Sequence, residues 1–431
     1  MHNGQWTILA AKGGSFLETR PAQTQHATSP PSSGYPEYVT FPVIGVVGGG
    51  QLARMMAPAA IQLGFTLRVL AEGPDVSAVA AVASSTVGDY RNLDDLSAFA
   101  RGVDVLTFDH EHVPGELLRA LQADGVNLQP QPDALAHAQD KIVMRRAIDR
   151  LGLPNPEWGE VSSVEDLQAF GDRIGWPVVL KTPRGGYDGK GVMVIDSLAD
   201  TDRAAAWFQG SPLLAEAKVN FSRELSALVA RTPSGVSRAW PVVHSIQVDG
   251  VCDEVIAPAA DLAPELATSI GDAALRIADE LGVTGVMAVE LFETPHTRTG
   301  FMVNELAMRP HNSGHWTMDG SVTGQFEQHL RAILDLPLGS TSMLGDVSVM
   351  KNYLGGSNVD LFSAYPAALA AEPAAKIHGY GKAVRPGRKI GHVNAVALAG
   401  ESLETVRGRA ERTAAILRDG HDSSKIRKGS A

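Results

Sequence analysis

A nearly uninterrupted apolar run, Val43–Val47, leads directly into three glycines and then into a segment with helical periodicity. The run has the composition of a strand buried on both faces, and Gln51–Leu63 carries apolar residues at helical spacing. A strand, a glycine-rich turn and a helix in this order form the opening unit of a parallel α/β sheet. The sequence therefore predicts a doubly wound, Rossmann-like domain near the beginning of the chain.

The pattern of the remaining sequence divides the chain into five parts. Residues 1–41 are rich in Pro, Ser, Thr, Gln and Gly, and we expect them to form a disordered tail. Residues 42–138 should form the doubly wound domain, and residues 139–340 a larger α+β domain. Residues 341–420 should form a small β-rich domain that ends in an amphipathic helix. Residues 421–431 are polar and basic, and we expect them to be frayed.

Composition excludes several classes of function. The 431 residues include 37 Lys plus Arg and 48 Asp plus Glu, and the formal net charge of -11 repels the phosphate backbone of nucleic acids. No apolar stretch of the sequence reaches the roughly 18 residues that a membrane span needs. The single cysteine, Cys252, excludes an intramolecular disulfide. We therefore expect a cytoplasmic protein that binds neither nucleic acids nor membranes.

The glycine-rich turn Gly48–Ala53 fits the pattern G-x-G-x-x-A, and Glu72 follows 19 residues after Ala53. This spacing is compatible with a nicotinamide dinucleotide held at a helix N-terminus. The same backbone amides could instead hold another anion, such as a monophosphate or a carboxylate. The turn could also join strand and helix without any ligand, so the motif by itself leaves three interpretations open.

A second glycine-rich segment, residues 181–191, lies between two strand-like apolar runs. Its four glycines and three cations, Lys181, Arg184 and Lys190, suit a mobile lid over phosphates. It is not a Walker A loop, because Gly191 rather than Ser or Thr follows Lys190, and because a strand rather than a helix comes next. An ordinary hairpin turn with solvated lysines is the alternative.

Two further strand-like runs, Val286–Phe292 and Phe301–Leu306, carry Glu290 and Glu305. If the runs form an antiparallel hairpin, the two carboxylates lie nearly opposite each other on one face. Like charges in this position need a cation. Oxygen ligands, including the amide of Asn304, suit Mg²⁺ that bridges nucleotide phosphates. Two solvated acids at the edge of a sheet are the alternative.

The polar run Arg309–His315 follows directly, where a loop would leave the sheet. His311 and His315 have i,i+4 spacing, which zinc ligands can use, but no third soft ligand lies near them in the sequence. A loop that binds a substrate is therefore the preferred interpretation. Ser313 could in addition cap the helix that follows.

Together, the lid hairpin, the paired carboxylates and the upstream glycine-rich domain resemble the ATP-grasp superfamily of carboxylate-amine ligases. Within it, residues 43–418 are similar to the 5-(carboxyamino)imidazole ribonucleotide synthases of purine biosynthesis. The segments that carry this resemblance are Gly48–Leu52, Gly186–Gly191, Asn304–Leu306, Arg309–His315 and Arg385–Lys389. The resemblance implies an ATP-grasp fold, a homodimer, and phosphorylation of bicarbonate by ATP. The resulting carboxyphosphate would carboxylate the exocyclic amine of 5-aminoimidazole ribonucleotide.

The resemblance also implies roles for individual residues. For ATP it implies that two cations bind the phosphates, Lys141 and Lys181, and that a lid covers them, formed by Gly186, Tyr187, Asp188, Gly189, Lys190, Gly191 and Val192. It implies that adenine contacts a linker made of Glu216, Ala217, Lys218 and Val219. It also implies that Glu224 binds the ribose and that Gln247 is a further ATP-binding position. For Mg²⁺ it implies Glu290, Asn304 and Glu305, of which the last two also contact ATP. For the ribonucleotide and bicarbonate it implies Gln51, Leu52, Glu111, Tyr187, Asp188, Lys190, Arg309, His311, Asn312, Ser313, His315, Lys382, Arg385 and Arg388.

The sequence departs from the family pattern at four places: Gln247 replaces His, Val192 replaces Gln, Ala217 with Lys218 replaces a bulkier pair, and Asp109–His112 varies the acidic-aromatic run while keeping Glu111. A ligase that uses formate and glycinamide ribonucleotide, or another bicarbonate-activating ligase, would keep the lid and the carboxylates but change the Arg309–His315 loop. A nicotinamide-dependent oxidoreductase would depend on the first glycine-rich turn and Glu72 alone. A non-catalytic protein would bind nucleotide without turnover.

Overall fold

The computed structural model describes residues 41–186 and 190–422. The expected disordered tail up to residue 40, the lid residues Tyr187, Asp188 and Gly189, and the expected frayed end from residue 423 lie outside the described residues. Among the helices of the described ranges, none combines the length and the apolar character that crossing a membrane requires.

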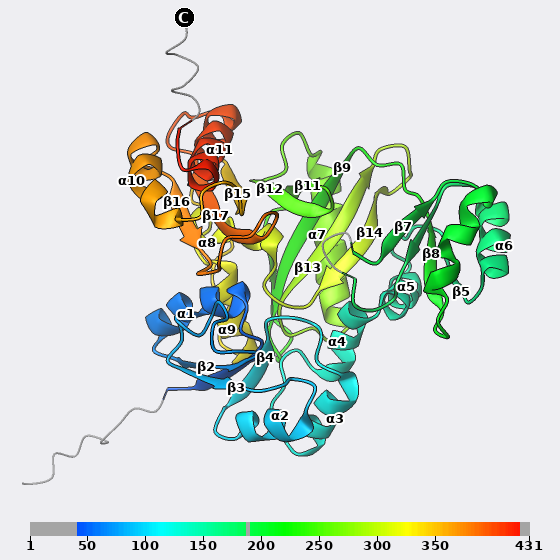
Figure 1. Ribbon diagram of the computed structural model, residues 1–431, viewed down its shortest axis with the longest axis horizontal. Helices are drawn as coiled ribbons and strands as arrows, with labels where there is room; N and C mark the ends of the chain where they lie inside the picture. Colours follow the sequence, from blue (N-terminus) through cyan, green and yellow to red (C-terminus); the bar gives the residue numbers. More distant parts are fainter. Residues whose placement is uncertain (1–40, 187–189, 423–431) are drawn as a thin grey trace, which may run out of the picture. The chain divides into compact units, whose positions relative to one another are not determined.

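The first sheet has four parallel strands in the order β3-β2-β1-β4 (Figure 1). Its elements are β1 (Val43–Val47), α1 (Gln51–Leu63), β2 (Thr66–Ala71), β3 (Ser84–Val87), α2 (Leu93–Ala100), β4 (Val105–Phe108) and α3 (Gly115–Ala123), followed by α4 (Pro132–Gln139). Val47 and Leu70 pack in one cluster with α2 and α3. Ile44, Val46 and Val69 pack in another cluster with α1. Helices therefore cover both faces of the sheet, which confirms the predicted doubly wound arrangement.

A helix from much later in the chain, α9 (Gln325–Ile333), completes the cover over the α1 side of this sheet. Its residue His329 is fully buried, and burial lowers the pKa of the imidazole to about 3, so the ring is neutral. Nδ1 of His329 accepts a 3.0 Å hydrogen bond from the amide of Val286, which leaves Nε2 to donate to the hydroxyl of Thr107, 2.9 Å away. One side chain thus joins the first sheet to the large sheet.

The large sheet has nine antiparallel strands, in the order β14-β13-β9-β11-β12-β15-β17-β16, with β10 paired to β9. Its strands are β9 (Arg223–Arg231), β10 (Ser237–Ala239), β11 (Val243–Val248), β12 (Val251–Ala257), β13 (Gly285–Thr294), β14 (Gly300–Ala307), β15 (Ser348–Leu354), β16 (Lys376–Gly379) and β17 (Lys389–Val396). The strands beyond residue 340 continue the same sheet, because β15 pairs with β12.

The helices around the large sheet are α7 (Pro264–Glu280), the short 3-10 helix η2 (Asn312–Gly314), α8 (Thr317–Gly320), α10 (Leu361–Ala371) and α11 (Leu403–Asp419). Helices α10 and α11 pack with β15 and β17 (Figure 1). The segment after residue 340 therefore contains α10 in addition to the predicted short strands and final helix.

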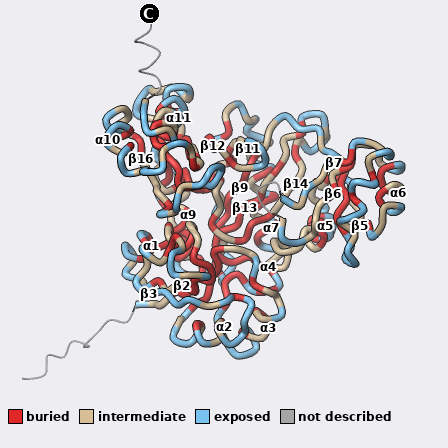
Figure 2. Tube along the Cα trace, in the orientation of Figure 1, coloured by how far each residue is buried: buried red, intermediate tan, exposed pale blue. Residues whose placement is uncertain are grey.

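A smaller antiparallel sheet has the order β5-β8-β6-β7. Its elements are α5 (Lys141–Arg150), β5 (Trp158–Val161), α6 (Val164–Ile174), β6 (Val178–Lys181), β7 (Val192–Ile195), the 3-10 helix η1 (Leu198–Trp207) and β8 (Leu213–Ala217). The predicted strand-loop-strand unit is the β6-β7 pair, which flanks the second glycine-rich segment. Figure 2 shows the buried residues concentrated along strands, whereas α2, α3 and α6 have extensive exposed faces.

A carboxylate of the chain itself holds the N-terminus of α1. Asp109, directly after β4, accepts a hydrogen bond from the amide of Gly50 and a second one, 3.4 Å long, from the amide of Ala53. A Cβ atom at position 50 would collide with the Asp109 carboxylate, and one at position 49 would collide with Val76. The glycines therefore allow close packing between the turn and neighbouring side chains.

We expect Gly50→Ala to lower the free energy of unfolding by about 1–3 kcal/mol, because the added methyl group must displace the carboxylate that caps α1. Gly73→Ala is the matched control, since a Cβ atom there meets no atom within 4 Å. Urea unfolding followed by circular dichroism measures both variants. Equal stability of the two variants would show that the packing at Gly50 is not needed.

Candidate active site

The predicted pairing of two carboxylates is present in the β13-β14 hairpin, where Glu290 and Glu305 are register partners. Burial, together with the nearby carboxylates of Glu305 and Glu224, raises the pKa of Glu290 to about 8. The Glu290 side chain keeps 27% of its surface accessible, so a ligand can still reach it. Acids that oppose each other's ionisation in this way favour a nearby cation.

The composition of this site fits Mg²⁺ that is shared with a substrate. Glu290, Glu305 and the side-chain amide of Asn304 offer oxygen atoms, which Mg²⁺ prefers. In the described part of the chain, no group of three or more His, Cys, Asp or Glu residues is arranged to hold a metal ion by itself. Mg²⁺ commonly completes such a partial ligand set with waters and nucleotide phosphates.

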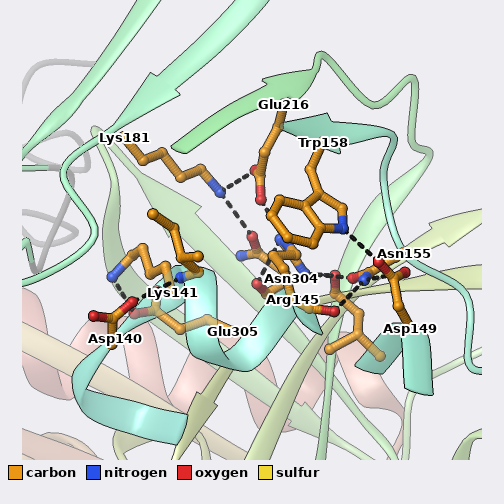
Figure 3. Close-up of polar contacts among 12 residues, drawn as sticks. Asp140, Lys141, Arg145, Asp149, Asn155, Trp158, Lys181, Glu216, Asn304 and Glu305 are labelled. Carbon is orange, nitrogen blue, oxygen red and sulfur yellow. Dashed lines mark hydrogen bonds and ion pairs between the residues drawn. The ribbon is translucent and has the colours of Figure 1, made fainter. Parts of the chain in front are cut away.

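Two lysines approach the hairpin from separate elements (Figure 3). Lys141 is the first residue of α5, and its Nζ lies 2.8 Å from Glu305 Oε1. Lys181 is the last residue of β6, and its Nζ lies 2.7 Å from Glu216 Oε2 and 3.4 Å from Asn304 Oδ1. The structure thus brings together the two predicted phosphate cations and the predicted metal ligands.

Arg145, which sequence reasoning missed, lies in the middle of this network (Figure 3). Its guanidinium is fully buried and donates to Glu216 Oε1 at 2.5 Å and to the Asn155 side chain at 2.9 Å. It also donates to the backbone carbonyls of Val303 and Asn304, at 2.7 and 2.9 Å. The available signal was its spacing: Arg145 is four residues after Lys141 and therefore on the same face of α5.

Glu216 is the carboxylate that these cations share. Burial by itself would raise its pKa, but the positive charges and hydrogen bonds of Arg145 and Lys181 outweigh burial and lower the pKa to about 2. Glu216 is therefore ionised at neutral pH. It forms a buried link between α5, β6 and β8.

The described ends of the expected lid are tied to the start of α5. The backbone amide of Lys141 donates to the carbonyl of Pro183 at 2.9 Å, and Arg184 pairs with Asp140 at 2.9 Å. Gly186 and Gly191 are half-buried, whereas Lys190 and Val192 are exposed. The middle residues of the lid, 187–189, lie outside the described residues.

The expected adenosine-binding positions lie at and directly after the end of β8 and in β9 and β11. Ala217 and Val219 are half-buried and Lys218 is exposed, so this linker borders solvent. Glu224 lies near the start of β9, and burial raises the pKa of its carboxyl. Gln247, in β11, donates a 3.0 Å hydrogen bond to the hydroxyl of Ser245.

The residues expected to bind the ribonucleotide form pairs that link the first domain to the large sheet. Arg309 donates to Glu111 Oε2 at 2.9 Å, and Lys382 donates to Gln51 Oε1. Burial opposes the charge of Arg309, but Glu111, with smaller contributions from Asp109 and Glu305, outweighs burial, so the pKa of the guanidinium is raised. Glu111 Oε1 and the side-chain nitrogen of Asn312 are buried and have no hydrogen-bond partner among the described residues. These atoms are suited to a polar ligand.

The C-terminal cations lie in the connection between β16 and β17. Arg385 and Arg388 are exposed, and Arg388 donates to the carbonyl of Ala383 at 3.2 Å. A further cation, Arg54 in α1, packs against Gly381 and donates to the carbonyl of Ser77 at 2.9 Å. Sequence reasoning missed Arg54, although it lies one helical turn after Gln51.

The suggested helix cap at Ser313 is wrong. The short helix η2 begins at Asn312, and the side chain of His311 accepts the hydrogen bond from the amide of Ser313. The hydroxyl of Ser313 is fully buried and bonds Ser226 at 2.7 Å and His311 Nδ1 at 2.8 Å. Its role is therefore to orient His311, whose pKa falls to about 3 because of burial and the charges of Arg309 and Lys389.

Two other expected substrate contacts, Leu52 and His315, have buried side chains. The side chain of Leu52 packs in the core of the first domain. His315 is 1% exposed, and its Nδ1 lies 2.8 Å from the side-chain nitrogen of Gln325. Its ring stacks on His392, with ring centroids 4.8 Å apart. Both side chains therefore contact the protein interior, and a substrate contact of either residue stays a prediction.

Two backbone amides of the first glycine-rich turn donate hydrogen bonds to carboxylates of the protein itself. The amide of Gly49 donates to Glu72 Oε2 at 3.1 Å, and the amide of Gly50 donates to Asp109. A dinucleotide pyrophosphate would need these amides. Glu72, which in a dinucleotide-binding protein would bind the ribose of the dinucleotide, instead accepts the hydrogen bond from Gly49. The structure thus disfavours the oxidoreductase interpretation.

Three family models match the chain. Residues 41–139 match the ribonucleotide synthetase preATP-grasp domain, residues 146–326 match the ATP-grasp domain, and residues 348–406 match the phosphoribosylaminoimidazole carboxylase C-terminal domain. Together these matches span the first domain, the small sheet and most of the large sheet.

Individual relatives match over most of their length. The N5-carboxyaminoimidazole ribonucleotide synthase of Mycobacterium leprae is 51% identical over 368 residues, which cover 82% of this chain and 83% of the relative. The synthase of Corynebacterium ammoniagenes is 49% identical over 383 residues, covering 88% and 92%. The structure of the Thermus thermophilus synthetase matches with a TM-score of 0.78, 36% identity and coverage of 86% and 98%. The Aspergillus clavatus synthase in complex with ADP and 5-aminoimidazole ribonucleotide matches with a TM-score of 0.78, 30% identity and coverage of 87% and 98%.

The buried charge of Glu216 predicts a specific pH dependence of stability. Its pKa of about 2 lies below the ordinary value of 4.5, so its stabilising effect is complete above pH 4.5 and is lost as the pH falls toward 2. We expect Glu216→Gln to be less stable than the unmodified protein by about 3–5 kcal/mol at pH 7, with a smaller difference at pH 3. Urea unfolding at a series of pH values tests this. A difference that does not change with pH would contradict the assignment.

Proposed function

The chain belongs to the N5-carboxyaminoimidazole ribonucleotide synthase family of ATP-grasp ligases, and from this premise we propose how its residues carry the reaction. The reaction is the ATP-dependent carboxylation of 5-aminoimidazole ribonucleotide in purine biosynthesis. We propose that bicarbonate supplies the carboxyl group and that ADP and phosphate are released. The convergence of Lys141 on Glu305 and of Lys181 on the Asn304 side chain, both in the β13-β14 hairpin, carries this proposal.

The phosphate end of ATP would lie between the two lysines and the hairpin. Lys141 and Lys181 would bind phosphate oxygens, and the lid, residues 186–192, would close over them and exclude water. Mg²⁺ held by Glu290, Asn304 and Glu305 would neutralise the charge that develops on the transferred phosphoryl oxygens. Arg145 holds the carbonyl of Asn304, so the protein atoms of this site are positioned before substrates bind.

The adenosine end would lie along β8 and β9. The linker Glu216–Val219 would meet adenine through backbone groups, and Glu224 would accept hydrogen bonds from the ribose hydroxyls. Gln247, which replaces the histidine of many relatives, would line the same site. The exposed and half-buried linker residues support this placement.

The ribonucleotide would lie between the first domain and the polar loop. Lys382, Arg385 and Arg388 would bind its phosphate monoester, since lysine and arginine suit phosphate oxygens. Arg309 would bind bicarbonate or its phosphorylated form. Glu111, with one carboxylate oxygen on Arg309 and the other without a partner among the described residues, would accept from the substrate.

We also propose a cytoplasmic homodimer with domains at residues 42–138, 139–340 and 341–420. The dimer is implied by the resemblance and can be measured by light scattering. Cys252 is a buried free thiol, and this fits a reducing compartment.

The proposed function predicts that the purified protein releases ADP from Mg²⁺-ATP and bicarbonate, and that 5-aminoimidazole ribonucleotide strongly stimulates this release. A coupled assay for ADP, run with and without the ribonucleotide, measures the effect. ADP release without stimulation would keep the ATP-grasp assignment and remove the substrate. Absence of release would favour a protein that binds nucleotide without turnover.

Glu305→Gln should lower turnover by about 10²-fold or more, because a neutral amide replaces a carboxylate beside the transferred phosphoryl group. We expect the fold to be retained, as measured by circular dichroism. Glu265→Gln, at an exposed position in the first turn of α7, is the matched control. A wild-type rate for Glu305→Gln would exclude Glu305 from the site.

A further inference from the structure

The contact between Lys141 and Glu305 places a cation where a metal ligand is expected. The Lys141 side chain is 12% exposed, and its Nζ lies 2.8 Å from Glu305 Oε1. Within the described ranges this is the ion pair that Glu305 forms. Glu290 is the register partner of Glu305 in the neighbouring strand, so the ammonium lies beside the proposed pair of metal ligands.

The backbone of Lys141 is fixed, whereas its side chain can turn. Asp140 caps α5 by accepting from the amides of Ile142 and Val143, and the amide of Lys141 itself donates to Pro183. The side chain contains four rotatable bonds, and a change of rotamer moves the ammonium while the helix stays in place. Lys141 can therefore leave Glu305 without a rearrangement of α5.

The second lysine of the site has a different environment. Lys181 pairs with Glu216, but Glu216 also pairs with the fully buried Arg145. If Lys181 moved, Glu216 would keep a cation. If Lys141 moved, Glu305 would lose the ion pair that it forms within the described ranges.

We propose that Lys141 is the resident counter-cation of Glu305 in the ligand-free enzyme, and that it must leave this carboxylate before a divalent cation can be held there. The inference rests on the proposed function, because the nucleotide phosphates give the ammonium its second position. Exchange of one cation for another keeps the Glu305 carboxylate paired with a cation throughout. Lys141 is thus the residue that couples binding of the divalent cation to binding of the nucleotide.

This exchange has a thermodynamic consequence. Without nucleotide, a divalent cation must displace Lys141 into a site where nothing new compensates its charge. With nucleotide, the displaced ammonium binds phosphate oxygens. Each ligand therefore strengthens the binding of the other, and the coupling is reciprocal.

Binding of Mn²⁺, a paramagnetic substitute for Mg²⁺, tests the proposal through the electron paramagnetic resonance signal of the free ion. In the absence of nucleotide and ribonucleotide, we expect Lys141→Met to bind Mn²⁺ about tenfold more tightly than the unmodified enzyme. Lys141→Arg, which keeps the charge, should remain close to the unmodified enzyme. ADP should strengthen Mn²⁺ binding less in Lys141→Met than in the unmodified enzyme, after correction for Mn²⁺ bound by free ADP.

Lys181→Met is the matched control, because it removes the same charge from the same site but leaves Glu216 paired with Arg145. It should tighten Mn²⁺ binding much less. Equal effects of the two Met variants would show that the net charge of the site, and not the contact with Glu305, controls the affinity, and would overturn the proposal. Unchanged or weaker Mn²⁺ binding by Lys141→Met would also overturn it.

Two measurements keep the outcome unambiguous. Lys141→Gln is titrated in parallel, so that a folding defect of one neutral variant, seen by circular dichroism, leaves the other to decide. Tight Mn²⁺ binding by the unmodified enzyme without nucleotide would overturn the proposal without any variant. The assay for ribonucleotide-stimulated ADP release is separate, and its failure would remove the substrate while leaving the Mn²⁺ comparison intact.

Discussion

The geometry of the site depends on the hydrogen bonds and the ion pair formed by the fully buried guanidinium of Arg145. Placing a charge away from water costs several kcal/mol unless partners satisfy it. Arg145 meets this requirement with Glu216, Asn155 and two backbone carbonyls of β14. These partners come from three separate elements, so the charge can be satisfied only when α5, β8 and β14 are in their native positions. The ligand-binding groups on these elements are therefore held in fixed positions relative to one another.

Polar side chains that contact two elements at once also join the other parts of the protein. His329 joins β4 to β13, and Arg309 with Glu111 joins the loop after β14 to the segment after β4. Each of these contacts links the first sheet to the large sheet through one or two buried polar groups. The ribonucleotide-binding residues are therefore held by the packing between sheets, and the nucleotide-binding residues by the network around Glu216.

Much of the fold could be predicted from local sequence patterns. The strand Val43–Val47 and the helix Gln51–Leu63 have the predicted bounds, because a continuous apolar run and helical periodicity are strong local signals. The pairing of Glu290 with Glu305 followed from the alternation of two neighbouring strands. The roles of Arg145 and Asp109 could not be predicted in this way, because their partners lie far away in the sequence. The family resemblance implied His315 as a substrate contact, and a polar residue in a polar run gives no sign that tertiary packing buries its side chain.

The continuity of the large sheet limits how the chain can be divided. β15 pairs with β12, so the three C-terminal strands share one hydrogen-bonded sheet with the hairpin of the active site. A chain cut before Ser348 would leave the backbone groups of β12 unpaired along an open edge, and such edges recruit strands from other molecules. The segment proposed as the third domain therefore shares its sheet with the preceding domain, and β15 has to be present for this edge of β12 to be paired. A chimaera made from two such enzymes therefore has to keep the pairing between β12 and β15. Without this pairing we expect the chimaera to self-associate through the exposed edge of β12.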